Sequence, residues 1–230
     1  MKFEMWSIWH ILYILSSLII FTIIYFAIRN HSDKVKIIVG FVLGVLSVAI
    51  LIIRNIDIFI RNGMDLEVIP LQVCHIGSLV AGFALIFKKK WLLLTSFCFN
   101  LVPAFLAMVF ADSLANYDTL WAIRPQTYVW GHILIVVCAL YGILVLRPKF
   151  NKYDLIKALV FVFIMCVAAS YAIHYLENYL TGVLIIFIYL IIMVPHLSFC
   201  MMFYHHLFMV GLRSIGFMLL LYLPFLLLFL

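Results

Sequence analysis

The chain has 230 residues, of which 68% are hydrophobic and 10% are charged, and its mean hydropathy is +1.27. A soluble domain is about half apolar and about a quarter charged, so this composition excludes a water-soluble globular protein. The net charge of +6 does not indicate nucleic-acid binding, because the Lys and Arg residues lie in short loops between apolar runs. We therefore predict a single integral membrane domain over residues 1–230, with membrane lipids as partners and no nucleic acid.

Apolar runs long enough to cross a bilayer follow one another along the chain. The nearly continuous apolar stretch 180–230 would reach about 76 Å as a helix, enough for two crossings of a core about 30 Å thick. Before it, six further runs lie at residues 8–28, 37–53, 69–87, 91–111, 127–146 and 156–175. The sequence thus predicts an all-α, polytopic transmembrane helical bundle of seven to eight spans.

The loop charges alternate between the two sides of this bundle. Eleven of the fifteen Lys and Arg residues fall in the first, third and fifth loops or at Arg213, and most of the acidic residues fall on the other side. Because short basic loops stay in the cytoplasm, we predict that the N-terminus lies outside. The expected location is the cell membrane, with multiple passes.

Several polar side chains are expected at one depth near the outer side. Cys74 and His75 would lie about 8 Å below the outer end of the third span, and His132 would reach nearly the same depth in the fifth. Ionisable residues inside spans are costly and usually face the bundle interior, so we interpret this group as a candidate site. The outer ends of the neighbouring spans add Arg54, Asn55, Asp112 and His174.

The same residue types also have ordinary structural roles. A structural ion pair explains Arg54 and Asp112 as well as a functional one does. A histidine near a helix end often hydrogen-bonds a headgroup or a carbonyl, which is the expectation for His10, His31, His205 and His206. A buried cysteine is commonly an inert small hydrophobe, which is the expectation for Cys98, Cys138, Cys166 and Cys200. No C-x-x-C pair indicates a disulfide framework or a structural zinc site.

Short sequence elements point to a family. Ile69-Pro70-Leu71-Gln72-Val73-Cys74 resembles the L-P-L-x-x-C element of the YwaF-like bacterial integral membrane family, to which the vertebrate transmembrane Cys/His phospholipid acyltransferases are related. Those relatives carry a histidine in the next-but-one span, where this chain has His132, although Gly131 precedes the histidine here instead of following it. Asn178-Tyr179-Leu180 and Tyr222-Leu223-Pro224-Phe225 resemble two further elements, whereas 180–209 lacks the usual Pro and Trp-Pro landmarks.

This resemblance implies acyl transfer on phospholipid in the outer leaflet, with Cys74 as nucleophile and His132 as base, and with no cofactor or metal. The thiolate is the reactive form of cysteine, and a nearby imidazole can generate it by taking the proton. His75 would point about 100° away from Cys74 on a helix and is expected to have a supporting role. An oxyanion donor is also needed, for which the candidates are Gln72, Asn55 and Arg54.

Three other interpretations remain open from the sequence. A transporter would need a polar path across the whole membrane, for which Pro195 and His196 are the best evidence. A non-enzymatic membrane scaffold would tolerate replacement of Cys74 and His132. A metal-dependent hydrolase would use His75, His132, His174 and Asp112, although the chain has no H-x-x-x-H pair. The choice between transferase and hydrolase, the lipid headgroup, the acyl length and the oligomeric state are also open.

Overall fold

The computed structural model describes residues 3–63, 68 and 73–177. Contacts within the chain divide it into residues 1–186 and 187–230, and every described residue belongs to the first of these units. The described part contains helices and no strand, which confirms the all-α prediction there. The two crossings predicted within 180–230 lie outside the described residues, so the number of spans stays a prediction.

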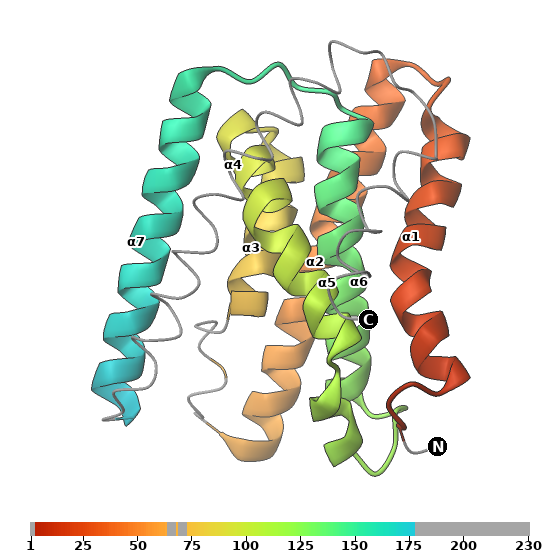
Figure 1. The fold of residues 1–230 in the computed structure, drawn as a ribbon, viewed down its shortest axis with the longest axis vertical. Coiled ribbons are helices and arrows are strands. Elements are labelled where there is room, and N and C mark those ends of the chain that lie inside the picture. The colour runs from red at the N-terminus through yellow and green to blue at the C-terminus, as the bar shows by residue number, and fades with distance from the viewer. Residues whose placement is uncertain (1–2, 64–67, 69–72, 178–230) are drawn as a thin grey trace. The chain divides into compact units, whose positions relative to one another are not determined.

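Successive long helices run in opposite directions (Figure 1). Among the described residues, four helical stretches are long and apolar enough to cross a membrane, namely Ile8–Ile28, Asp33–Asn62, Lys90–Val109 and Ile123–Leu144, and the apolar helix Cys74–Phe87 is shorter. The elements are α1 (Ile8–Ile28), α2 (Asp33–Asn62), α3 (Val73–Phe87), α4 (Lys90–Thr95), the π-helical turn η2 (Ser96–Asn100), α5 (Leu101–Val109), the 3₁₀ turn η3 (Asp112–Asn116), α6 (Ile123–Leu144) and α7 (Lys152–Glu177).

Helix α2 is longer at both ends than the apolar run 37–53 that predicted it. Its last turns are polar, and there Arg61 Nε donates to Asp57 Oδ1 across one turn at 2.8 Å. Such pairs support helix beyond an apolar segment, and α2 ends only at Gly63, which has a φ of 73°. Arg54 therefore lies inside helix α2, well before its last residue, although the apolar run ends at residue 53.

The fourth predicted span, 91–111, is built from two α-helices joined by the π turn η2. In this turn the Leu101 N–H bonds to the Ser96 carbonyl five residues earlier, which widens the helix locally. Pro103, which has no N–H to donate, follows two residues later. Within the turn, Asn100 is buried and its side-chain amide donates to the Gly77 carbonyl of α3 at 3.4 Å.

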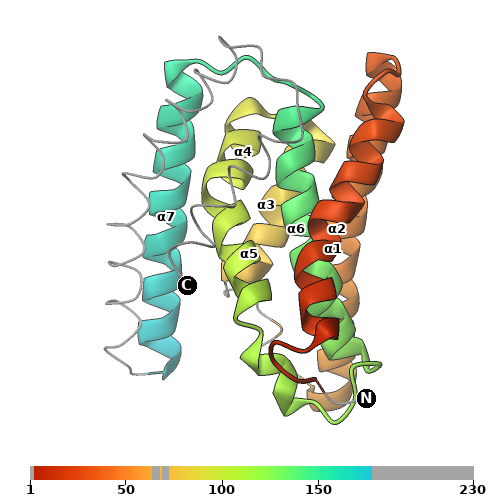
Figure 2. The same ribbon diagram turned by 45° about the vertical axis from the view of Figure 1, so that its right-hand side comes forward.

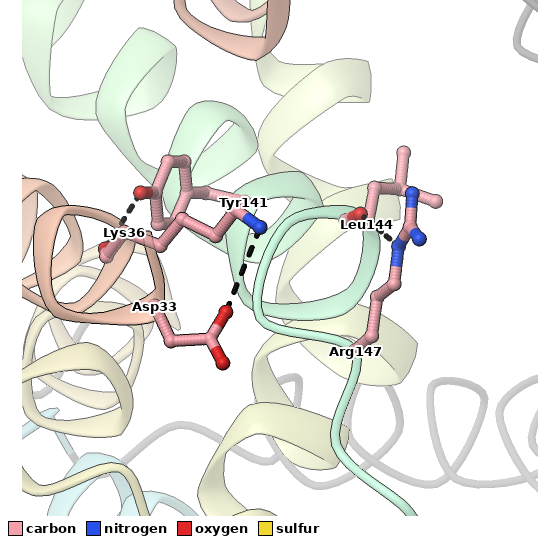
Figure 3. Close-up of polar contacts among 5 residues, drawn as sticks. All are labelled: Asp33, Lys36, Tyr141, Leu144 and Arg147. Carbon is pink, nitrogen blue, oxygen red and sulfur yellow. Dashed lines mark hydrogen bonds and ion pairs between the residues drawn. The ribbon is translucent and has the colours of Figure 1, made fainter. Parts of the chain in front are cut away.

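Helix α6 lies at the centre of the described part and contacts α1, α2, α3 and α5 (Figure 2). All of its residues from Gly131 to Ile143 are buried, as expected for a helix that is apolar on every side. Near its end, the Tyr141 hydroxyl donates to the Lys36 carbonyl of α2 at 2.7 Å (Figure 3). This position lies beside the ion pair of Lys36 and Asp33, whose charged atoms are 3.6 Å apart. Helix α7 contacts α4.

Candidate functional site

Helix α2 supplies Arg54 from its buried face. Gly44, Ser47 and Leu51 are buried at helical spacing, and Arg54 continues the same stripe one turn further. The guanidinium Nη1 donates to Asn55 Oδ1 at 3.3 Å, so the neighbouring amide helps to hold the side chain. The charge of Arg54 acts on residues 74 and 75 of α3, which places it close to both.

The first turn of α3 carries Cys74 and His75. Cys74 forms no disulfide and is partly exposed, whereas His75 is only 6% exposed. His75 Nδ1 is buried and has no hydrogen-bond partner among the described residues. A buried polar atom without a partner is costly in a folded protein, so this nitrogen needs a hydrogen bond that the described side chains do not supply.

Helix α6 supplies His132, whose ring is held in one orientation. Its Nδ1 lies 2.8 Å from the backbone carbonyl of Tyr128, one turn earlier. A carbonyl oxygen only accepts, so Nδ1 carries the hydrogen and, in the neutral ring, Nε2 keeps its lone pair. The Tyr128 ring packs against His132 with 4.3 Å between ring centroids, and its hydroxyl donates to the Ala107 carbonyl at 2.8 Å. His132 is therefore arranged to accept a proton at Nε2.

Electrostatic interactions connect these helices into one cluster. Tyr128 interacts with Cys74 and with Asp112, the first residue of η3. His75 interacts with His132. Arg54 therefore lies near Cys74 and His75, His75 lies near His132, and Tyr128 lies near Cys74 and Asp112.

Comparison with known proteins gives the family of this chain. The model of the TMEM164 family matches residues 3–221, almost the whole chain. The chain belongs to the TMEM164 family. Searches among curated proteins and among solved structures found no match. The family is one of transmembrane proteins, and together with the four long apolar helices it identifies the chain as a multi-pass membrane protein.

Two of the predicted site residues are not placed by the structure. Gln72 lies outside the described residues, and His174 belongs to α7 at a position where only the backbone is described. In the described part of the chain, no group of three or more His, Cys, Asp or Glu side chains is arranged to hold a metal ion. That finding gives no support to the hydrolase interpretation, whose ligand set includes the undescribed His174 side chain.

The cluster also includes two tyrosines that the sequence analysis did not name. Tyr128 joins the residues on α3 to His132, and Tyr13 of α1 interacts with Tyr128. The Tyr13 hydroxyl is buried and has no hydrogen-bond partner among the described residues. Tyr128 lies four residues before His132, so helical spacing alone was enough to place both on one face of α6.

Other histidines and cysteines have structural surroundings. His10 is fully buried: its Nδ1 accepts from the Trp6 N–H at 3.0 Å, so Nε2 donates to the Met108 carbonyl at 2.9 Å. A hydrogen bond to a carbonyl is one of the two structural roles that the sequence analysis expected for His10. Cys98 and Cys138 are buried and form no disulfide, as expected for small hydrophobes.

Proposed function

We propose that the chain is a membrane-embedded acyltransferase that acts on phospholipid acyl chains through a Cys-His acyl-enzyme. Its resemblance to the YwaF-like family and the related Cys/His acyltransferases implies this activity. The structural observation that carries the proposal is the hydrogen bond from His132 Nδ1 to the Tyr128 carbonyl. This bond orients the imidazole and leaves Nε2 as the basic atom, in the cluster that contains the Cys74 thiol.

In the first step, the Cys74 thiol gives its proton to His132 Nε2 while the sulfur attacks the carbonyl carbon of a glycerol ester. The carbon–oxygen ester bond then breaks, and the acyl chain remains on sulfur as a thioester. The departing lysolipid oxygen takes the proton back from His132. The cysteine is thereby acylated and the histidine is neutral again.

In the second step, an acceptor hydroxyl loses its proton to His132 and attacks the thioester, which returns the thiol. A lipid hydroxyl makes the reaction a transfer, whereas water makes it a hydrolysis. Negative charge develops on the carbonyl oxygen in both steps and needs a positive group or N–H donors beside it. Arg54 is the group that we favour, because its charge already acts on Cys74.

The proposed site faces the outer leaflet of the cell membrane, with the N-terminus outside. This orientation rests on the basic loops, which join α1 to α2, α3 to α4 and α6 to α7 at one end of the helices (Figure 1). The cluster lies toward the opposite end, because Cys74 is in the first turn of α3. Ester bonds near the outer headgroups would be within its reach.

The test is covalent capture of the acyl group. Purified protein is incubated with phospholipids of defined chains and analysed by mass spectrometry for an adduct that hydroxylamine removes. We expect the adduct on Cys74 in the wild type, and no adduct in Cys74→Ala or His132→Ala. Cys98→Ala, which removes a buried thiol outside the cluster, is the matched control and should keep the adduct. An unmodified wild type with every lipid tried, or an adduct that survives in Cys74→Ala, would refute the proposal.

A further inference from the structure

Arg124, the second residue of α6, carries a buried edge without a partner. Its Nε and Nη2 atoms are both inaccessible to solvent, and neither has a hydrogen-bond partner among the described residues. These two nitrogens form one side of the guanidinium and donate in parallel, which matches two oxygens of one anion. Arg124 as a whole is part-buried, but two buried N–H donors without acceptors are costly in a folded protein. The side chain is therefore arranged for an anion that the described side chains do not provide.

The local helix geometry adds positive potential at the same place. The N-cap residue, Ala122, makes no side-chain capping bond, and the first turn of α6 contains no acidic residue. The first N–H groups of a helix have no partner within the helix, and the helix dipole makes this end positive. Anions bind favourably at such ends, so backbone and side chain favour the same kind of ligand.

The level of Arg124 along the bundle indicates where the anion comes from. Trp121, just before α6, is 79% exposed, and Trp9, near the start of the neighbouring α1, is 60% exposed. Exposed tryptophans mark the depth of the lipid headgroups in membrane proteins. The anions held at that depth are the phosphates of phospholipids, so lipid is the source that the position favours.

Arg124 also lies on the same face of α6 as the proposed base. Residues 124, 128 and 132 are spaced by four, so their side chains follow one stripe of the helix. The step from Arg124 to His132 is about 12 Å along the axis. A phospholipid whose phosphate is bound near the end of α6 would therefore extend its glycerol esters along this stripe toward His132.

We propose that the Nε and Nη2 edge of Arg124 binds the phosphodiester of a phospholipid headgroup. Phosphate binding itself does not depend on any reaction. The further assignment, that this lipid is the substrate and that Arg124 sets its position relative to His132, rests on the proposed function.

The test measures lipid binding by the full chain in detergent, in a Cys74→Ala background that excludes acyl transfer. The rise in melting temperature is titrated with a phospholipid, with a diacylglycerol of the same acyl chains, and with inorganic phosphate. We expect the phospholipid to stabilise the protein and the diacylglycerol to do so at least about tenfold less effectively. Arg124→Gln should weaken phospholipid binding about tenfold or more, because it removes the charge and the paired donors.

Two variants complete the experiment. Arg124→Lys keeps the charge but loses the two parallel N–H donors of the guanidinium, so phospholipid binding should fall several-fold. This variant decides the question if Arg124→Gln does not fold. Arg147→Gln, which changes an exposed arginine at the end of the helices that carries the basic loops, should bind as the unmodified background does. Binding that is unchanged in a folded Arg124 variant would overturn the proposal. Equal stabilisation by inorganic phosphate would overturn the assignment to lipid.

The acyl-enzyme and the phosphate site at Arg124 can be refuted independently of each other. Headgroup binding that depends on Arg124, without an adduct on Cys74, supports the lipid site and refutes the acyl-enzyme. An adduct on Cys74 that forms equally well after Arg124→Gln, with unchanged lipid binding, supports the acyl-enzyme and overturns the phosphate site.

Discussion

Gly44 of α2 and Gly82 of α3 face each other at a contact between backbones. A Cβ atom at Gly44 would lie 2.7 Å from the Gly82 carbonyl oxygen, and one at Gly82 would lie 2.8 Å from the Gly44 carbonyl oxygen. Nearby, the Ser47 hydroxyl donates to the Ser78 carbonyl at 3.0 Å. Small residues let membrane helices approach this closely. The contact holds α3, which carries the candidate nucleophile, against α2.

Replacing either glycine by alanine should therefore destabilise the protein. The added methyl group meets backbone atoms that cannot rotate away, and overpacking of this kind costs about 1–3 kcal/mol of unfolding free energy. Gly131→Ala is the matched control, because the nearest atom to its Cβ is a side-chain carbon of Ile50 at 3.9 Å. It should be neutral or stabilising by up to about 1 kcal/mol. Thermal unfolding in one detergent compares the three variants, and equal melting temperatures would contradict the close contact.

His10 should matter for stability and not for chemistry. In His10→Phe, the buried Met108 carbonyl loses its donor, at a cost of about 1–3 kcal/mol, and the Trp6 N–H loses its acceptor. His31→Phe, at an exposed position after α1, should leave the melting temperature unchanged. Chemical denaturation measures the difference. An unfolding free energy for His10→Phe equal to that of the wild type would show that the two hydrogen bonds do not form.

His75→Leu and Asn100→Leu should differ in their effect on the free energy of unfolding. His75→Leu removes a buried nitrogen without a partner among the described residues, so the free energy of unfolding should stay within about 1 kcal/mol of the wild type or rise. Asn100→Leu removes the side-chain hydrogen bond to the Gly77 carbonyl and leaves that oxygen with its bond within α3, so it should lower the free energy of unfolding by about 1 kcal/mol. Unfolding of both variants in one detergent tests this. Equal losses would mean that His75 Nδ1 is satisfied in the protein.

Much of the fold follows from composition and from the lengths of the apolar runs. The run 8–28 coincides with α1, and the run 127–146 largely coincides with α6. Each match has the same cause, because a chain in lipid must satisfy its backbone groups internally and helices do so within one segment. The polar ends of α2 were missed, since hydropathy does not register a helix that continues through charged residues such as Asp57 and Arg61.

The sequence by itself determined a helical membrane protein, and it predicted a similar depth for Cys74 and His132. Only the tertiary structure decided which side chains meet. Lipid and the interior of the helix bundle are both apolar, so the apolar pattern does not show which face of each helix points inward. That rotation turns Arg54 toward the first turn of α3 and hides one edge of Arg124. It also sets the close backbone contact between Gly44 and Gly82, which the apolar pattern does not specify.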